Sequence, residues 1–268
     1  MHGTLLAAVF FLFIPLYLAL VTASQEGVHL MQAPMPIWPG KALFYNLKSV
    51  MLHGLQSTGG QPVWQMLLNS FVMATVIAVG KIVLALFSAF ALVYFDLPLK
   101  GGLFALILST MMLPVEVRIM PTFQVVASFG WLNTFKGLSL PLIASATATF
   151  FFYQLFKSIP KELVDAAKLD GAGPLRFFKD ILLPLSKAQA GSLFIILFIY
   201  GWNQYLWPLV VTTDNEMTTI VMGMRYLVGV ADQLPQWHVI MCIALIALTP
   251  PCLIMWVMRR WFERGLIH

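Results

Sequence analysis

The chain has 268 residues, of which 60% are hydrophobic and 10% are charged, and its mean hydropathy is +0.85. This composition excludes an ordinary soluble domain and predicts an integral membrane protein. The formal net charge is +5, but most Lys and Arg residues lie in a few loops between apolar segments, so the charge gives no support for a nucleic-acid partner.

Several segments are apolar and long enough to cross the roughly 30 Å hydrocarbon core, which takes about 20 helical residues. They are predicted at 4–22, 67–95, 103–125, 138–156, 190–211 and 239–258. The chain shows no internal repeat. We therefore expect an all-α polytopic membrane protein with six transmembrane helices, folded as a single transmembrane domain over 1–268.

The first of these segments has a second interpretation as a signal peptide, because Val21-Thr22-Ala23 resembles a cleavage site. A signal peptide would require Lys or Arg before its apolar region, and no such residue precedes this segment. Its removal would also leave an odd number of spans. A retained helix is therefore favoured.

Lys and Arg are concentrated in the 95–102 turn, the 157–188 loop and the 259–268 tail. The intervening hydrophilic segments hold only Lys41, Lys48, Lys136 and Arg225. Because positive residues mark cytoplasmic loops, both termini and the 157–188 loop are predicted to be cytoplasmic.

Three charged residues are predicted at membrane depth, Lys81 in the second span and Glu116 and Arg118 in the third. Such a charge is costly in hydrocarbon and usually faces a partner or a polar cavity. One interpretation is a structural pair of Lys81 with Glu116 between helices. The other is that these residues line a path for a polar solute.

The 157–188 loop carries the longest charged block of the chain. Glu162 suits the positive end of a short helix, Gly171 can end it in a left-handed conformation, and Pro174 can begin another helix. The alternative is an amphipathic helix lying on the lipid surface, but its apolar face holds few large residues.

Residues of this block stand at the offsets of the EAA motif: Asp165, Ala166, Ala167, Gly171, Ile181 and Pro184. The block resembles the EAA loop of ABC importer permeases, which forms coupling helices in a groove of an ATPase subunit. The resemblance implies that these residues couple the chain to the ATPase, with the alanines allowing close approach of the helix. Asp165 stands where the family usually has Glu, which keeps the charge with one methylene less.

Near the end of the predicted fifth span stand Trp202, Asn203, Gln204 and Tyr205. They are either an interfacial aromatic belt with two amides bonded to neighbouring helices, or translocation-path residues that meet substrate hydroxyls. The polar segment 212–216 follows, and we expect it to be an outward loop that helps to dislodge solute from a binding protein.

Segments 112–122, 145–150 and 201–209 resemble permeases of carbohydrate-uptake importers, and more closely those for sn-glycerol-3-phosphate. This resemblance implies an ABC type I importer permease in the bacterial inner membrane. It also implies three kinds of partner besides membrane lipid: a second homologous permease, two ATPase subunits, and a periplasmic or lipid-anchored solute-binding protein. A phosphate ester would favour Lys81 and Arg118 along its path.

Enzyme motifs are missing from the sequence, which has neither His-Glu-x-x-His nor Gly-x-Ser-x-Gly. We therefore expect no catalytic residue, metal site or bound cofactor, and ATP and Mg would be used by the partner ATPase. Two alternatives remain open. One is a permease for a neutral sugar or polyol, and the other is a six-span membrane enzyme or stand-alone facilitator.

Overall fold

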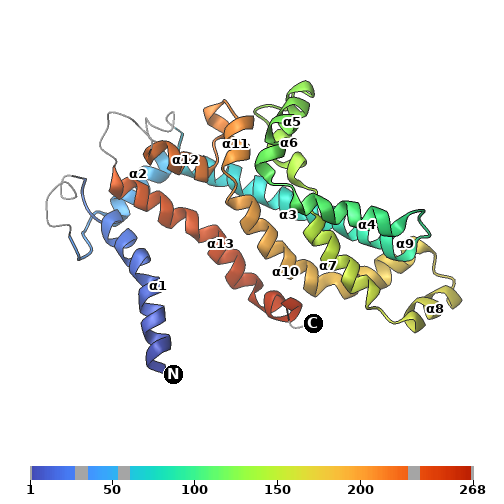
Figure 1. Cartoon of the computed structure of the whole chain (residues 1–268). Coiled ribbons are helices and arrows are strands. Elements are labelled where there is room, and N and C mark those ends of the chain that lie inside the picture. Colours follow the sequence, from blue (N-terminus) through green and yellow to red (C-terminus); the bar gives the residue numbers. More distant parts are fainter. Residues whose placement is uncertain (1, 28–35, 54–60, 229–235, 267–268) are drawn as a thin grey trace. The chain divides into compact units, whose positions relative to one another are not determined.

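The computed structural model describes residues 2–27, 36–53, 61–228 and 236–266, apart from the side chains of residues 2, 115, 116 and 262–266. Over these ranges every regular element is a helix (Figure 1). The chain divides into two compact units. One comprises Met1–Phe71 with Gln204–Cys252, and the other comprises Val72–Asn203 with Leu253–His268.

Four of the described helices are long and apolar enough to cross a membrane. They are α1 (His2–Ala23), α3 (Val63–Tyr94), the helical run Pro174–Trp202 and α13 (Trp237–Leu266). Two bent pairs raise the count to six if each pair is one span. The all-helical polytopic fold is therefore confirmed, although not all spans are straight.

The third predicted span, 103–125, is sharply bent. Helix α4 (Lys100–Ser109) and the 3₁₀ turn η3 (Thr110–Met112) meet α5 (Val115–Ser128) at 104°. Leu113 is extended at the break, as expected for a residue before Pro114, because the proline ring disfavours the helical conformation there.

The fourth predicted span, 138–156, is also interrupted. Helix α6 (Phe135–Ser139) and the 3₁₀ turn η4 (Leu140–Leu142) meet α7 (Ala146–Lys157) at 49°. Ser145 begins α7 by accepting a hydrogen bond from the Ala148 N–H at 3.2 Å, which satisfies one of the unpaired donors of the first turn.

The fifth span differs most from the expected range of 190–211. Its helical run comprises α9 (Pro174–Phe177), the π-helical turn η5 (Phe178–Leu182) and α10 (Leu183–Trp202). In the π turn, the Leu183 N–H donates to the Phe178 carbonyl five residues earlier. Pro184 follows and has no N–H to donate, so the wider turn accommodates the interruption of the α-helical ladder.

In the first unit, hydrogen bonds join the end of α1 to α2 (Leu43–His53) and α13. The buried Asn46 side chain donates to the carbonyls of Ala23 and Gln25, both at 2.9 Å, and the Cys242 thiol donates to the Ala23 carbonyl at 3.5 Å. Most of α1 before this point exposes large apolar side chains. Such a surface suits contact with lipid or with another apolar helix.

Candidate functional site

The block that carries the EAA motif folds as two helices joined by a tight elbow. Helix α8 (Lys161–Leu169) ends in a Schellman motif, in which the Ala172 N–H donates to the Ala167 carbonyl at 2.9 Å and the Gly171 N–H to the Lys168 carbonyl at 3.0 Å. Gly171 has φ +70°, a left-handed conformation that glycine adopts without strain. The left-handed helix stop expected at Gly171 is present, and α9 begins at Pro174 as expected.

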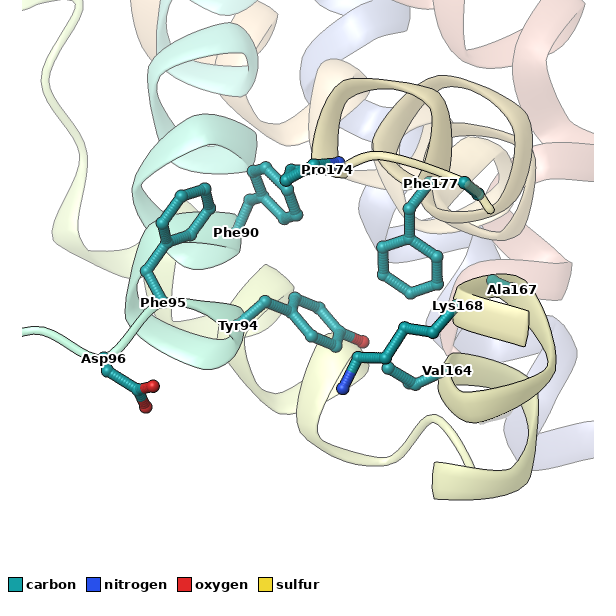
Figure 2. A pocket seen from close by; sticks show the side chains of 10 residues that line it. Phe90, Tyr94, Phe95, Asp96, Val164, Ala167, Lys168, Pro174 and Phe177 are labelled. Carbon is teal, nitrogen blue, oxygen red and sulfur yellow. The ribbon is translucent and has the colours of Figure 1, made fainter. Parts of the chain in front are cut away.

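A pocket of about 390 Å³ lies between the end of α3 and this elbow (Figure 2). The Tyr94 ring stands edge-on to Phe177 with 5.1 Å between centroids, and the Tyr94 hydroxyl donates to the Phe156 carbonyl at 3.1 Å. Figure 2 shows Lys168 of α8 beside the Tyr94 ring. The pocket is lined by Phe90, Tyr94, Phe95, Asp96, Val164, Ala167, Lys168, Ala172, Pro174 and Phe177.

The two alanines of the motif face different surroundings. Ala167 is buried and lines the aromatic pocket, so its small size serves packing within this chain. Ala166 and Asp165 are exposed and remain available to a partner. Asp165 makes a loose pair with Lys168, with 3.9 Å between charged atoms.

The last two motif residues lie on the helical run that follows the elbow. Ile181 is half-buried within the π turn, and Pro184 is exposed in the first turn of α10. Arg176 and Asp180 form a second exposed pair on the same run, at 3.5 Å. The motif therefore covers α8, the elbow and the π turn.

A second cavity, of about 380 Å³, surrounds Lys81 at the breaks of both bent spans. Lys81 is 7% exposed, and its Nζ lies 3.7 Å from the centroid of the Tyr200 ring on α10. Arg118 on α5 lines the same cavity, so two of the expected path residues come together. The cavity is lined by Lys81, Thr110, Met111, Leu113, Arg118, Ala144, Ser145, Ala146, Thr147, Ile196, Leu197 and Tyr200.

The expected Lys81–Glu116 pair involves a side chain outside the described residues, because that of Glu116 is not among them. Tyr200 is the partner of Lys81 that sequence reasoning missed. A cation over an aromatic face is attracted by the negative charge of the ring, and this attraction is stronger where water is excluded. The contact joins α3 to α10 over a long stretch of sequence, and no local pattern indicates it.

The remaining expected path residues do not line this cavity in the described part of the chain. Trp202 is buried at the end of α10 and stacks on Phe198 at 5.7 Å, while Asn203 is exposed just beyond it. Gln204 and Tyr205 belong to the other compact unit, where Arg225 lies 5.5 Å from the Tyr205 ring.

The segment after α11 (Leu206–Val211) is held by hydrogen bonds with α3. The buried Asn69 side chain donates to the carbonyls of Glu216 at 2.7 Å and Thr218 at 3.0 Å. The Ser70 hydroxyl accepts from the Ile220 N–H at 2.9 Å, where α12 (Ile220–Val228) begins. The C-terminal end of this loop, residues 216–220, is therefore anchored to α3.

The aromatic face of α3 was also missed. Phe87, Phe90 and Tyr94 follow helical spacing, and Phe90 packs on Phe178 with 5.1 Å between ring centroids. That spacing was a usable signal, because residues three and four positions apart share a helix face. Among the described residues, no cluster of three or more His, Cys, Asp or Glu side chains could hold a metal ion.

Comparison with known proteins gives one family and a set of close relatives. Residues 81–268 match the family described as binding-protein-dependent transport system inner membrane component. The sn-glycerol-3-phosphate transport system permease protein UgpE of Rhizobium meliloti (strain 1021) is 47% identical over 267 residues, which are 100% of this chain and 95% of that protein. The protein of the same name from Pectobacterium atrosepticum is 47% identical over 266 residues, 99% of this chain and 94% of its own.

A solved structure shares the fold. A chain of a bacterial ABC transporter involved in the import of the acidic polysaccharide alginate superposes with a TM-score of 0.80. The match covers 97% of this chain and 96% of that one, at 18% sequence identity. At this identity the likeness establishes the fold alone.

Proposed function

The chain belongs to the family of binding-protein-dependent transport system inner membrane components, and from this membership we propose that it forms half of the translocation path of an sn-glycerol-3-phosphate importer. The proposed substrate rests on the 47% identity over 267 residues to a permease named for that solute. As a member of a permease family, the chain is a transport subunit and not an enzyme. The alternative of a membrane enzyme is thereby set aside.

Partners follow from the family in general terms, because a binding-protein-dependent permease works with a binding protein, an ATPase and another permease. We propose a complex with one second, homologous permease and two ATPase subunits that hydrolyse ATP with Mg. The binding protein would deliver solute at the outer side. The excess of Lys and Arg in the 95–102, 157–188 and 259–268 segments supports a cytoplasmic location for both termini.

The α8–α9 elbow is the proposed contact with the ATPase. Asp165 and Ala166 are exposed on this elbow, and Phe177 of α9 packs edge-on against the Tyr94 ring of α3 with 5.1 Å between centroids. A movement of the ATPase against α8 would therefore reach the end of α3 through packed side chains. Densely packed groups transmit such displacements because they compress little.

The test is uptake by the whole complex. The chain is co-expressed with its second permease, ATPase and binding protein, purified and reconstituted into proteoliposomes that contain ATP. We expect ATP-dependent and binding-protein-dependent accumulation of labelled sn-glycerol-3-phosphate. An ATPase variant unable to hydrolyse ATP provides the control.

The second candidate substrate is a neutral sugar or polyol. In the same vesicles, labelled glycerol and a neutral disaccharide are offered at the same concentration as the phosphate ester. Accumulation of a neutral solute without the phosphate ester would overturn the proposed substrate while leaving the permease role intact. Uptake by this chain alone without ATP would overturn the importer assignment.

A further inference from the structure

We propose that the cavity around Lys81 is a subsite of this chain for the phosphate group of the transported solute. This inference rests on the proposed function, and it adds that this permease itself contacts the charged end of the solute. The cavity lies wholly within one compact unit, between α3, α5, α7 and α10. Its volume of about 380 Å³ falls within the roughly 300–1,000 Å³ of small-molecule sites.

The charge of the cavity favours an anion. Lys81 and Arg118 are both among the lining residues, and none of the described lining residues is acidic. The ion pairs of Asp165 with Lys168 and of Arg176 with Asp180 lie elsewhere, at the α8–α9 elbow. Two cations that share one cavity repel each other, and an anion between them would replace this repulsion by attraction.

Lys81 is placed for this role by its surroundings. Its side chain is more than nine-tenths buried, and the described residues supply it with no hydrogen-bond acceptor or carboxylate, only the face of the Tyr200 ring. An ammonium group has three donors, and a ring face satisfies them incompletely. A phosphate oxygen in the cavity would provide the missing acceptor.

The start of α7 adds a third contribution. Ser145, Ala146 and Thr147 line the cavity, and they are the cap and the first two residues of a helix of 12 residues. The first N–H groups of a helix have no acceptor within the helix, and they carry the positive end of its dipole. Phosphate groups bind at such helix ends, and here the end lies in the same cavity as both cations.

Single neutralisations provide the first test. Lys81→Met and Arg118→Met are introduced separately into the complete complex, and KM and maximal rate are measured for uptake of sn-glycerol-3-phosphate. We expect each change to raise KM roughly tenfold, because a charge-assisted contact is lost, and to affect KM more than the maximal rate. Lys81→Arg and Arg118→Lys keep the charge and should restore most of the affinity.

Lys136→Met is the matched control. It removes one cation from an exposed position on α6 that is not among the described residues lining the cavity. Its KM should stay at the wild-type value. If Lys81→Met prevents assembly of the complex, Arg118→Met still decides the matter, because the Arg118 side chain is exposed and its loss leaves no unfilled core.

An anionic lipid headgroup carries the same phosphate chemistry as the solute, so a separate experiment distinguishes these two sources of the anion. The KM of uptake by wild type and both Met variants is compared in proteoliposomes of phosphatidylcholine with and without phosphatidylglycerol. A solute subsite predicts the same rise in KM in both lipids. A rise that occurs only with phosphatidylglycerol would assign the cavity to a headgroup and overturn the solute subsite.

The outcomes separate the two proposals. Wild-type complexes that import sn-glycerol-3-phosphate with a KM unchanged by both Met variants would overturn the subsite and leave the proposed function standing. Wild-type complexes that import a neutral solute and no phosphate ester would overturn both. A rise in KM in the Met variants, absent in Lys136→Met and reversed by the conservative exchanges, supports the subsite.

Discussion

Gly171 has φ +70°, and no heavy atom lies within 4 Å of the position that a Cβ would take. A side chain would therefore fit in space, and only the backbone conformation opposes it. Left-handed geometry costs a residue with a Cβ about 1 kcal/mol, less for Asn, while proline cannot adopt it. We expect ATP-driven uptake to fall in the order Gly, Asn, Ala, Pro at this position.

Gly173→Ala is the control for this series. Gly173 also has open space around it, but its φ is −70°, which any residue adopts. Uptake by this variant should match wild type. Wild-type uptake by Gly171→Ala and Gly171→Pro would show that the left-handed elbow is unnecessary for coupling.

Ala166 and Ala167 give a second prediction at this scale. Ala167→Arg forces a long charged side chain into the aromatic pocket and should destabilise the elbow by about 1–3 kcal/mol. Ala166→Arg stays exposed and should leave the elbow folded while blocking its contact with the ATPase. Both variants should lose uptake, but limited proteolysis should cut the α8 region faster only in Ala167→Arg.

Equal protease resistance of these two variants would contradict the assignment of Ala167 to packing within the chain. The sequence motif itself did not distinguish the two alanines. Their difference depends on how α8 is rotated against Tyr94 and Phe177, and that rotation is set by packing between segments far apart in the chain.

At the scale of elements, the fixed end of the 212–220 segment depends on Asn69. Asn69→Ala removes two hydrogen bonds from a buried site, each worth about 1 kcal/mol, and leaves the carbonyls of Glu216 and Thr218 without this donor. We expect weaker stimulation of ATP hydrolysis by the binding protein. The measurement is the hydrolysis rate of the reconstituted complex with and without the binding protein.

Gln65→Ala is the matched change, because Gln65 donates to the same Glu216 carbonyl at a longer 3.3 Å in an exposed position. Its effect should be small. Undiminished stimulation in Asn69→Ala would mean that this loop takes no part in the response to the binding protein.

Hydropathy predicted where apolar segments lie, but not how they bend. Windows of about 20 residues average over Pro114 and over Ser145, and the chain breaks near both. The fifth span is likewise predicted to begin at residue 190, although its helical run begins at Pro174, because the first turns of that run are charged. Local capping signals were more reliable, since Gly171 and Pro174 act through their own backbone geometry.

The candidate site was likewise predictable in its residues but not in their arrangement. Lys81 and Arg118 were predicted from the cost of intramembrane charge, a rule that needs only sequence. Their meeting in one cavity and the contact of Lys81 with Tyr200 required the rotation of α3, α5 and α10 about their axes. Hydropathy contains no information on that rotation.

At the scale of the whole molecule, the proposed topology can be tested with cysteines. Cys242 and Cys252 are first replaced by Ala, and then Ser158→Cys and Asn215→Cys are introduced separately at exposed positions. In intact spheroplasts, an impermeant maleimide should label Asn215→Cys and not Ser158→Cys. After permeabilisation both should react, and labelling of Ser158→Cys in intact cells would contradict a cytoplasmic elbow.

The two exposed ion pairs, Asp165 with Lys168 and Arg176 with Asp180, have a consequence for ionic strength. Each joins residues one turn apart on a helix, and such pairs contribute about 0–1 kcal/mol and weaken in salt. The elbow itself depends on the Gly171 backbone and on aromatic packing, which mobile ions do not screen. Raising the potassium chloride concentration should therefore leave the protease resistance of α8 unchanged. It should weaken any charge-dependent binding of the ATPase to α8, so that less ATPase copurifies with the chain. A salt titration therefore measures the contact between the subunits separately from the fold of the loop.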